Sequence, residues 1–384
     1  MSSRALQKVS PIETTGRKQH KEKKVRYFDY GLLAMIILIL AFGLVMLYST
    51  SAYSASVLYD DPAHFLKRQA AAAALGFAAL IVISHIPYQF YAKIHGLIYV
   101  VALGMCIAVS FVGTDMDTGS RRWFKVGSIT FQPSEFAKIA IIITMAAIIA
   151  NGVKTLRSWK KVVVAFIMVL PLFASIAITN LSTAVIVMGI AYVMLFVASK
   201  PKGIFLIIAG TGVLGIIFFI LRAGYRGGRV AMWLHPEDYP NADVYQTLQG
   251  LYAIGAGGLF GKGLGGSVQK LGVLPVAQND MIFAIICEEL GIFGAVCVIL
   301  LYLIMFWRLL YIANHARDLM GSYLVIGIMV HFALQVIMNI AVVTNSIPNT
   351  GVILPLISYG GTSVMLLLAE LGIAFSVSRQ IPME

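Results

Sequence analysis

The sequence predicts an all-α, polytopic membrane protein with ten transmembrane helices. Of its 384 residues, 59% are hydrophobic and only 12% are charged, and the mean hydropathy is +0.86. A soluble domain carries about 25% charged residues, so the composition excludes that class. Apolar runs of about 20 residues, the length that crosses a bilayer as a helix, recur along the whole chain.

These runs follow a polar, basic tail. Residues 1–26 hold eight Lys or Arg and are expected to form a disordered cytoplasmic tail, while residues 27–384 form the membrane domain. No small-residue cleavage site closes the first apolar run, so a cleaved signal peptide is not expected. The ten runs begin near Tyr30, Arg68, Phe90, Pro133, Lys161, Thr183, Gly203, Met281, Leu319 and Val352.

The loops between the runs set the orientation, because cytoplasmic loops carry an excess of Lys and Arg. With the basic tail inside, the three basic loops all fall on the cytoplasmic side, and an even number of spans returns the C-terminus there. The net charge of +12 therefore reflects topology and not nucleic-acid binding. The loops hold Lys154, Arg157, Lys160 and Lys161, then Lys200 and Lys202, then Arg308 and Arg317.

Two outer segments, residues 113–132 and 222–280, are long and polar. The second forms a large extracytoplasmic loop between spans seven and eight without strong helix or strand signals, and loops of this length are usually functional. Its residues 255–266 include seven glycines. A phosphate-binding loop is excluded because Ala256 replaces the first glycine and Gly263 replaces the Ser or Thr. We expect a flexible or re-entrant lid.

Residues 348–363 interrupt the last apolar region with helix-breaking and polar residues. Irregular backbone at membrane depth is tolerated only where it is buried in protein or lines a wet cavity. The segment is therefore predicted to form part of a working site, with Ser358, Tyr359, Gly360 and Gly361 as candidate substrate-binding residues.

Asp280 ends the large loop and opens span eight. Its position fits a helix N-cap, where a carboxylate accepts backbone hydrogen bonds, and it fits a catalytic role equally well. Glu288 and Glu289 follow about 12 Å further along a continuous helix. They are weak candidates for metal ligands, and a structural role is favoured because adjacent carboxylates point in different directions.

Further charged and polar residues occur within or beside the spans. Glu135 and Lys138, at i and i+3, share a face of span four, as a local ion pair or as functional charges, since charges inside a span are costly. On span nine, His331, Gln335 and Asn339 form a polar stripe, for which hydrogen bonding between helices is favoured over a cavity lining. The sequence names no partner for Glu370.

Several of these stretches resemble, in order, the motifs of the shape, elongation, division and sporulation family, which includes FtsW, RodA and SpoVE. The resemblance extends from about residue 27 to 379. Val276, Gln278 and Met281 depart from the family pattern near Asp280, and Asn180 replaces a usual acid. The motifs are residues 348–363, residues 275–291, the Phe-Leu-Lys-Arg-Gln element at 65–69, and Gln132-Pro133-Ser134-Glu135 with Lys138.

This resemblance implies a peptidoglycan glycosyltransferase that polymerises lipid II at the outer face of the bacterial cytoplasmic membrane. Asp280 aligns with the essential aspartate of the family and becomes the candidate catalytic base. The resemblance also implies a divalent cation, Mg²⁺ or Mn²⁺, no organic cofactor, and a class B penicillin-binding protein as the partner. The other candidate substrate-binding residues are Arg68, Arg121, Arg122, Trp123, Lys125, Gln132, Ser134, Glu135 and Lys138.

Two alternatives remain open. Intramembrane charges and proline-interrupted helices also suit a lipid II flippase, and a non-catalytic scaffold of the division machinery would leave activity indifferent to Asp280. The sequence does not decide between division, elongation and sporulation, although the basic tail favours the first or the last.

Overall fold

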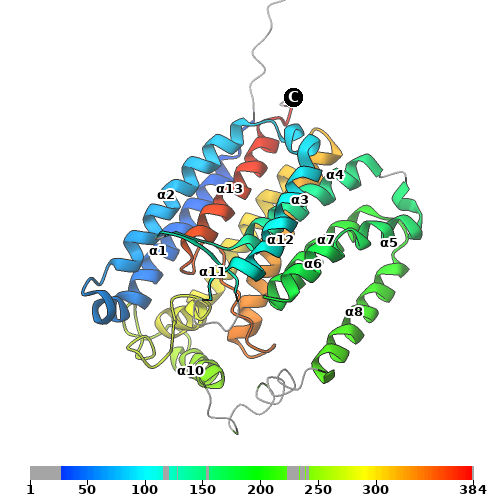
Figure 1. The fold of residues 1–384 in the computed structure, drawn as a ribbon. Coiled ribbons are helices and arrows are strands. Elements are labelled where there is room, and N and C mark those ends of the chain that lie inside the picture. The colour runs from blue at the N-terminus through cyan, green and yellow to red at the C-terminus, as the bar shows by residue number, and fades with distance from the viewer. Residues whose placement is uncertain are drawn as a thin grey trace, which may run out of the picture.

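The computed structural model confirms the all-α class (Figure 1). It describes residues 27–115, 121–127, 129–152, 155–222, 233, 238 and 242–382. The predicted tail, residues 1–26, lies outside the described residues, as does part of the loop predicted at 222–280. The α-helices are α1 (Tyr30–Tyr59), α2 (His64–His85), α3 (Tyr88–Val112), α4 (Pro133–Gly152), α5 (Trp159–Ile167), α6 (Leu170–Ala177), α7 (Leu181–Ala198), α8 (Gly203–Arg222), α10 (Ala242–Gly257), α11 (Ile282–His315), α12 (Leu319–Val343) and α13 (Gly361–Ser378).

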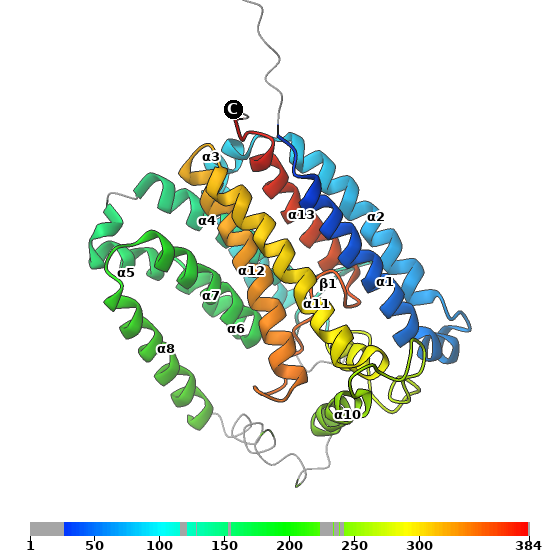
Figure 2. The same cartoon turned by 180° about the vertical axis from the view of Figure 1, so that it is seen from behind.

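Within the described ranges, nine helical segments are long and apolar enough to cross a membrane. One of them, Trp159–Ala177, consists of α5 and α6, and Pro171 lies in the first turn of α6, where its missing N–H costs nothing. α8 is a further apolar helix of 20 residues and stands at the edge of the bundle (Figures 1 and 2). The remaining regular elements are the 3-10 helix η1 (Thr155–Arg157) and a hairpin of β1 (Phe124–Val126) and β2 (Ile129–Phe131).

The helices differ in how deeply they are buried. In α4 and α13 about four-fifths of the most apolar stretch is inside the bundle (83% and 78%), whereas α2 and α3 are buried over only 22% and 17%. The outer helices therefore present apolar side chains outward, as lipid contact requires. Phe28, just before α1, stacks on Phe375 near the end of α13, with ring centroids 5.0 Å apart, so the two helices meet at one end of the bundle.

α11 is broken at Gly291, and the expectation of one continuous helix is wrong. Gly291 adopts φ 67° and ψ −166°, which separates the short half-helix at 282–290 from the long remainder. A break in a helix leaves backbone N–H and C=O groups without hydrogen-bond partners, and lipid cannot supply them. Four hydrogen bonds from residues 258–263 satisfy them. They are Lys262 N–Glu288 O and Gly263 N–Glu289 O, both 2.9 Å, and Ile292 N–Gly258 O and Phe293 N–Leu259 O, at 3.0 and 3.1 Å.

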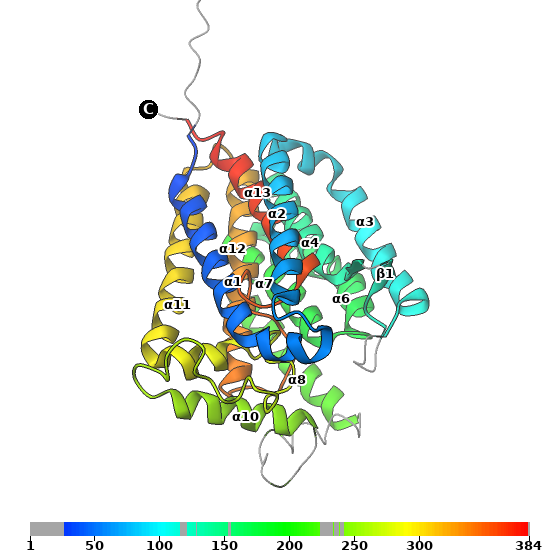
Figure 3. The ribbon, with the colours of Figure 1, turned by 90° about the vertical axis from the view of Figure 1, so that its left-hand side faces the viewer.

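The glycines of this segment are explained by its close approach to α11. A Cβ atom at Gly257 would lie 1.9 Å from the carbonyl oxygen of Cys287, and one at Gly261 would lie 2.1 Å from that of Glu289. Residues 257–263, called the glycine cap below, are thus fixed to the broken helix, and the lid expectation is wrong. The expectation that the large loop contains no helix is also wrong, because α10 crosses the end of the bundle beside α11 (Figure 3).

The close approach at Gly261 predicts a position-specific loss of stability. Gly261→Ala adds a methyl group against the α11 backbone, and overpacking of this kind costs about 1–3 kcal/mol beyond the strain of a positive φ. Gly263→Ala is the matched control, because Gly263 has a similar φ of 88° but open space around it. Thermal unfolding in detergent should show a clearly lower midpoint for Gly261→Ala than for Gly263→Ala. Equal midpoints would contradict the proposed packing.

Candidate active site

The irregular segment between α12 and α13, residues 344–360, is bonded to several helices. The side chain of Gln69, in α2, donates from Nε2 to the carbonyl of Ser358 at 3.0 Å and accepts from the Gly360 N–H at 3.1 Å. The Ser358 hydroxyl accepts from the Leu354 N–H at 2.9 Å. The backbone of this segment is therefore satisfied from within the protein, as irregular structure among spans requires.

The segment also reaches Asp280. The amide of Asn339, in α12, donates from Nδ2 to the carbonyls of both Asp280 and Val352, each at 2.7 Å. Next to this bond, the Tyr359 N–H donates to the carbonyl of Gln278 at 2.9 Å. Asn339 thus joins the loop before α11 to the segment before α13, which supports the hydrogen-bonding interpretation of the polar stripe on span nine.

Asp280 itself lies half-buried one residue before the N-cap of α11. Met281 is the N-cap and makes no side-chain capping bond, so the N-cap interpretation of Asp280 is wrong. The Asp280 Oδ1 atom accepts a hydrogen bond of 3.3 Å from the side chain of Gln246 in α10. Four residues earlier, Val276 has φ 48°. A β-branched residue rarely adopts this conformation, so the chain approaches Asp280 through a strained turn.

An ion pair and a hydrogen-bonded pair of ionisable side chains are buried between α4, α12 and α13. Lys138 Nζ lies 2.8 Å from Glu135 Oε1, and the Ser363 hydroxyl donates to Glu135 Oε2 at 2.8 Å. His331 Nδ1 lies 2.9 Å from Glu370 Oε2, which supplies the partner that the sequence did not name. Lys138 is only 1% exposed and its charge is compensated by Glu135, which disagrees with its prediction as a substrate-binding residue.

Arg68 and Tyr359 lie together at the start of α2. The Arg68 side chain hydrogen-bonds to the Tyr359 hydroxyl, and the Phe65 ring packs edge-on against Tyr359, with centroids 5.0 Å apart. Gly361, the first residue of α13, packs near Ala72 in the same helix as Arg68.

The hairpin region holds the remaining predicted cations. Arg121 donates to the carbonyl of Phe111 at 3.0 Å, and Arg122 donates to that of Thr179 at 2.7 Å. Lys125 lies exposed on β1, while Trp123 is half-buried and its carbonyl accepts from the Thr114 N–H at 2.8 Å.

The strand β2 contacts α13, so the hairpin adjoins the segment that reaches Asp280. Beyond β2, the Gln132 carbonyl accepts from the Glu135 N–H at 3.1 Å, and Ser134 is buried in the first turn of α4. The motif from Gln132 to Lys138 thus contacts the start of α13 through the hydrogen bond from Ser363 to Glu135. Its main role is to hold the helices of the bundle together.

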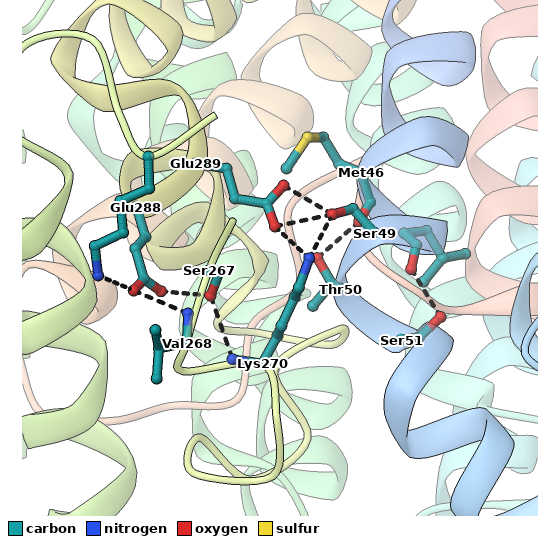
Figure 4. A network of polar contacts seen from close by, with 11 residues as sticks. Met46, Ser49, Thr50, Ser51, Ser267, Val268, Lys270, Glu288 and Glu289 are labelled. Atoms are coloured by element: carbon teal, nitrogen blue, oxygen red, sulfur yellow. Dashed lines mark hydrogen bonds and ion pairs between the residues drawn. The ribbon is translucent and has the colours of Figure 1, made fainter. Parts of the chain in front are cut away.

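Glu288 and Glu289 do not form a metal site (Figure 4). Glu288 pairs with Lys262 at 2.7 Å, and Glu289 pairs with Lys270 at 2.7 Å and accepts from Ser49 in α1 at 2.8 Å. The two carboxylates diverge to separate lysines and are fully buried. Across the ranges that the structure describes, no three His, Cys, Asp or Glu side chains gather closely enough to hold a metal ion. The favoured structural role agrees with these contacts.

The fold is that of a polytopic membrane protein. Two segments of non-helical backbone lie among its helices, close to the half-buried carboxylate of Asp280. The FtsW, RodA and SpoVE family model, described as cell cycle protein, matches residues 30–382. The chain belongs to this family.

Relatives agree over nearly the full length. The chain is 39% identical over 354 residues to stage V sporulation protein E of Bacillus subtilis, covering 91% of this chain and 97% of that protein. It is 34% identical over 364 residues to a probable peptidoglycan glycosyltransferase FtsW of Trichlorobacter lovleyi, covering 93% and 95%.

Solved structures are similar as well. The rod shape determining protein RodA of Thermus thermophilus is 25% identical with a TM-score of 0.69, covering 93% of this chain and 98% of that one. A chain from a structure described as the structural coordination of polymerization and crosslinking by a peptidoglycan synthase complex is 25% identical with a TM-score of 0.77, covering 93% and 99%.

The buried ion pair in α4 predicts a characteristic double-mutant result. Lys138→Met leaves the Glu135 carboxylate without its cation, and breaking a buried pair costs about 3–5 kcal/mol. The double variant Glu135→Gln, Lys138→Met removes both charges and should recover most of the loss. Chemical or thermal unfolding in detergent measures both. A double variant as unstable as Lys138→Met alone would contradict the interpretation that an unpaired charge causes the loss.

Proposed function

We propose that this chain is a peptidoglycan glycosyltransferase that polymerises lipid II, a disaccharide-pentapeptide linked to undecaprenyl pyrophosphate, into glycan strands. Relatives that match over nearly their whole length are named as probable enzymes of this kind, and a similar structure belongs to a peptidoglycan synthase complex. The single observation that carries the proposal is the half-buried Asp280 carboxylate, held where the polar interior of the bundle meets the segment before α13.

In the proposed mechanism Asp280 acts as the general base. It takes the proton from the 4-hydroxyl of the acceptor sugar while that oxygen attacks the anomeric carbon of the donor. The glycosidic bond forms with inversion as the bond to the pyrophosphate breaks. A pyrophosphate leaves as an anion, so it needs cations and not a second carboxylic acid, which explains why one catalytic carboxylate suffices.

Arg68, Arg121, Arg122 and Lys125 are the proposed cations for this pyrophosphate. Lys125 is exposed, and Arg68 lies beside Tyr359 in the segment that reaches Asp280. Lys138 is left out of this set because its charge is compensated within the bundle. Trp123, Gln132, Ser134, Ser358, Gly360 and Gly361 are retained as residues that shape the same region.

The cellular setting is part of the proposal. We expect the active site at the outer face of the cytoplasmic membrane, both termini in the cytoplasm, and a class B penicillin-binding protein as the crosslinking partner. The similarity to a chain of a peptidoglycan synthase complex supports such a partner. Among the described residues, no cluster of carboxylates could hold the divalent cation that the family resemblance implies. Removing Mg²⁺ or Mn²⁺ with a chelator tests whether polymerisation depends on such a cation.

Asp280→Asn should abolish polymerisation while the protein stays folded. Removal of a general base costs about 10²- to 10⁴-fold in rate, and the substitution keeps the shape of the side chain. Asp61→Asn is the matched control, because Asp61 is a surface carboxylate in the α1–α2 loop, paired only with Lys67 among the ion pairs seen in the described chain. The assay follows labelled lipid II, with the purified chain and its transpeptidase.

Three outcomes separate the possibilities. Glycan strands from wild type and Asp61→Asn but not from Asp280→Asn support the proposal. If all three proteins make glycan strands, Asp280 is not the general base. If no variant makes strands, transport of lipid II in vesicles then separates a flippase, which moves it regardless of Asp280, from a scaffold, which does not.

A further inference from the structure

Gln246 has a fixed orientation beside the Asp280 carboxylate. Its Nε2 atom donates to Asp280 Oδ1 and to the carbonyl of Pro275, both at 3.3 Å. Its Oε1 atom accepts from the side chain of Asn349 at 3.1 Å. Since an amide presents oxygen on one side and NH₂ on the other, the bond from Asn349 directs the donor of Gln246 toward Asp280.

Asn349 also shapes the turn on the other side of the carboxylate. Its Oδ1 atom accepts from the Gly351 N–H at 3.2 Å, and Gly351 has φ 65°. A Cβ atom at Gly351 would lie 3.9 Å from Asp280 Oδ2. The two oxygens of Asp280 thus face different neighbours: Oδ1 faces Gln246 in α10, and Oδ2 faces the turn at Gly351.

The backbone of Asp280 is held separately by Asn339. This bond fixes where the residue sits, whereas the Gln246 bond restrains the rotation of its carboxylate. A general base must present one oxygen to the proton that it takes, in a defined geometry. The two restraints come from different elements, α12 and α10, so they can be tested independently.

We propose that Gln246 is a positioning residue for glycosyl transfer, which orients the Asp280 carboxylate, and that Asn349 acts through Gln246. The inference rests on the proposed role of Asp280 as the base. An amide suits this task because it restrains the carboxylate without placing a full positive charge beside it, which would weaken the base. The bond of 3.3 Å is slightly longer than the usual range of about 2.7–3.2 Å, so it restrains the carboxylate and leaves it able to accept a proton.

The proposal gives the large loop a direct part in the reaction. Gln246 lies in α10, within the segment that joins α8 to α11, and α10 packs against α11. The loop thus supplies one contact to the carboxylate and, through the glycine cap, the backbone partners of the broken helix that follows it.

The test compares Gln246→Leu, Asn349→Ala and the double variant in the polymerisation assay. Gln246→Leu should lower kcat about ten- to hundredfold, the effect of losing one hydrogen bond to a charged group, with KM within about twofold. The acidic limb of the rate profile should move to higher pH, because a donor favours the ionised carboxylate. The double variant should lose clearly less than the product of the two single losses, since Asn349 acts through the bond from Gln246 to Asp280.

Controls separate positioning from stability. Gln89→Leu removes a similar amide pair, Gln89 with Gln380, at the end of the bundle where α13 finishes, and should leave kcat and the pH profile unchanged. Gln246→Glu preserves the side-chain shape if the leucine variant unfolds. An ionised glutamate cannot donate, so this variant should also be slow at neutral pH.

The outcomes distinguish this inference from the proposed function. An inactive Asp280→Asn protein together with wild-type kcat and pH profile in Gln246→Leu and Gln246→Glu would overturn the positioning role alone. Loss confined to KM, or additive losses in the double variant, would overturn it as well. An active Asp280→Asn protein would overturn the proposed base, and the positioning role with it.

Discussion

Unwound backbone inside a membrane protein must find its hydrogen-bond partners within the protein, and the site depends on this constraint. Two such breaks occur near Asp280. One is the segment between α12 and α13, which is satisfied by Gln69 and Asn339, and the other is the kink at Gly291, which is satisfied by the glycine cap. Asp280 lies between them, so the bonds that satisfy the two breaks also fix the surroundings of the carboxylate.

The buried ionisable side chains also find their partners within the protein. Glu135, Lys138, His331 and Glu370 are almost fully buried. Glu135 and Lys138 form an ion pair, and His331 shares a hydrogen bond with Glu370. Uncompensated charges at this depth would be very costly. These residues thus have partners within the bundle, whereas Asp280 is only half-buried.

Much of the architecture was predictable because a membrane span has a simple signal: about 20 apolar residues between polar loops. The segment at 348–363 was predictable because irregular, polar backbone among spans is costly. Asp280 was singled out by the family resemblance, since its position alone fits a helix N-cap equally well. The kink was not predictable, since Gly291 occurs within an otherwise helical pattern. The pairs Glu288–Lys262 and Glu289–Lys270, and the bond from Gln246 to Asp280, join residues far apart in sequence, where local spacing carries no information.

The half-helix of α11, residues 282–290, has a mechanical consequence. It is two and a half turns long, with Asp280 just before one end and the backbone of the glycine cap bonded to the other, about 13 Å away. A helix this short behaves as a stiff rod. The packing of the glycine cap at one end of this half-helix therefore helps to set the position of Asp280 at the other end.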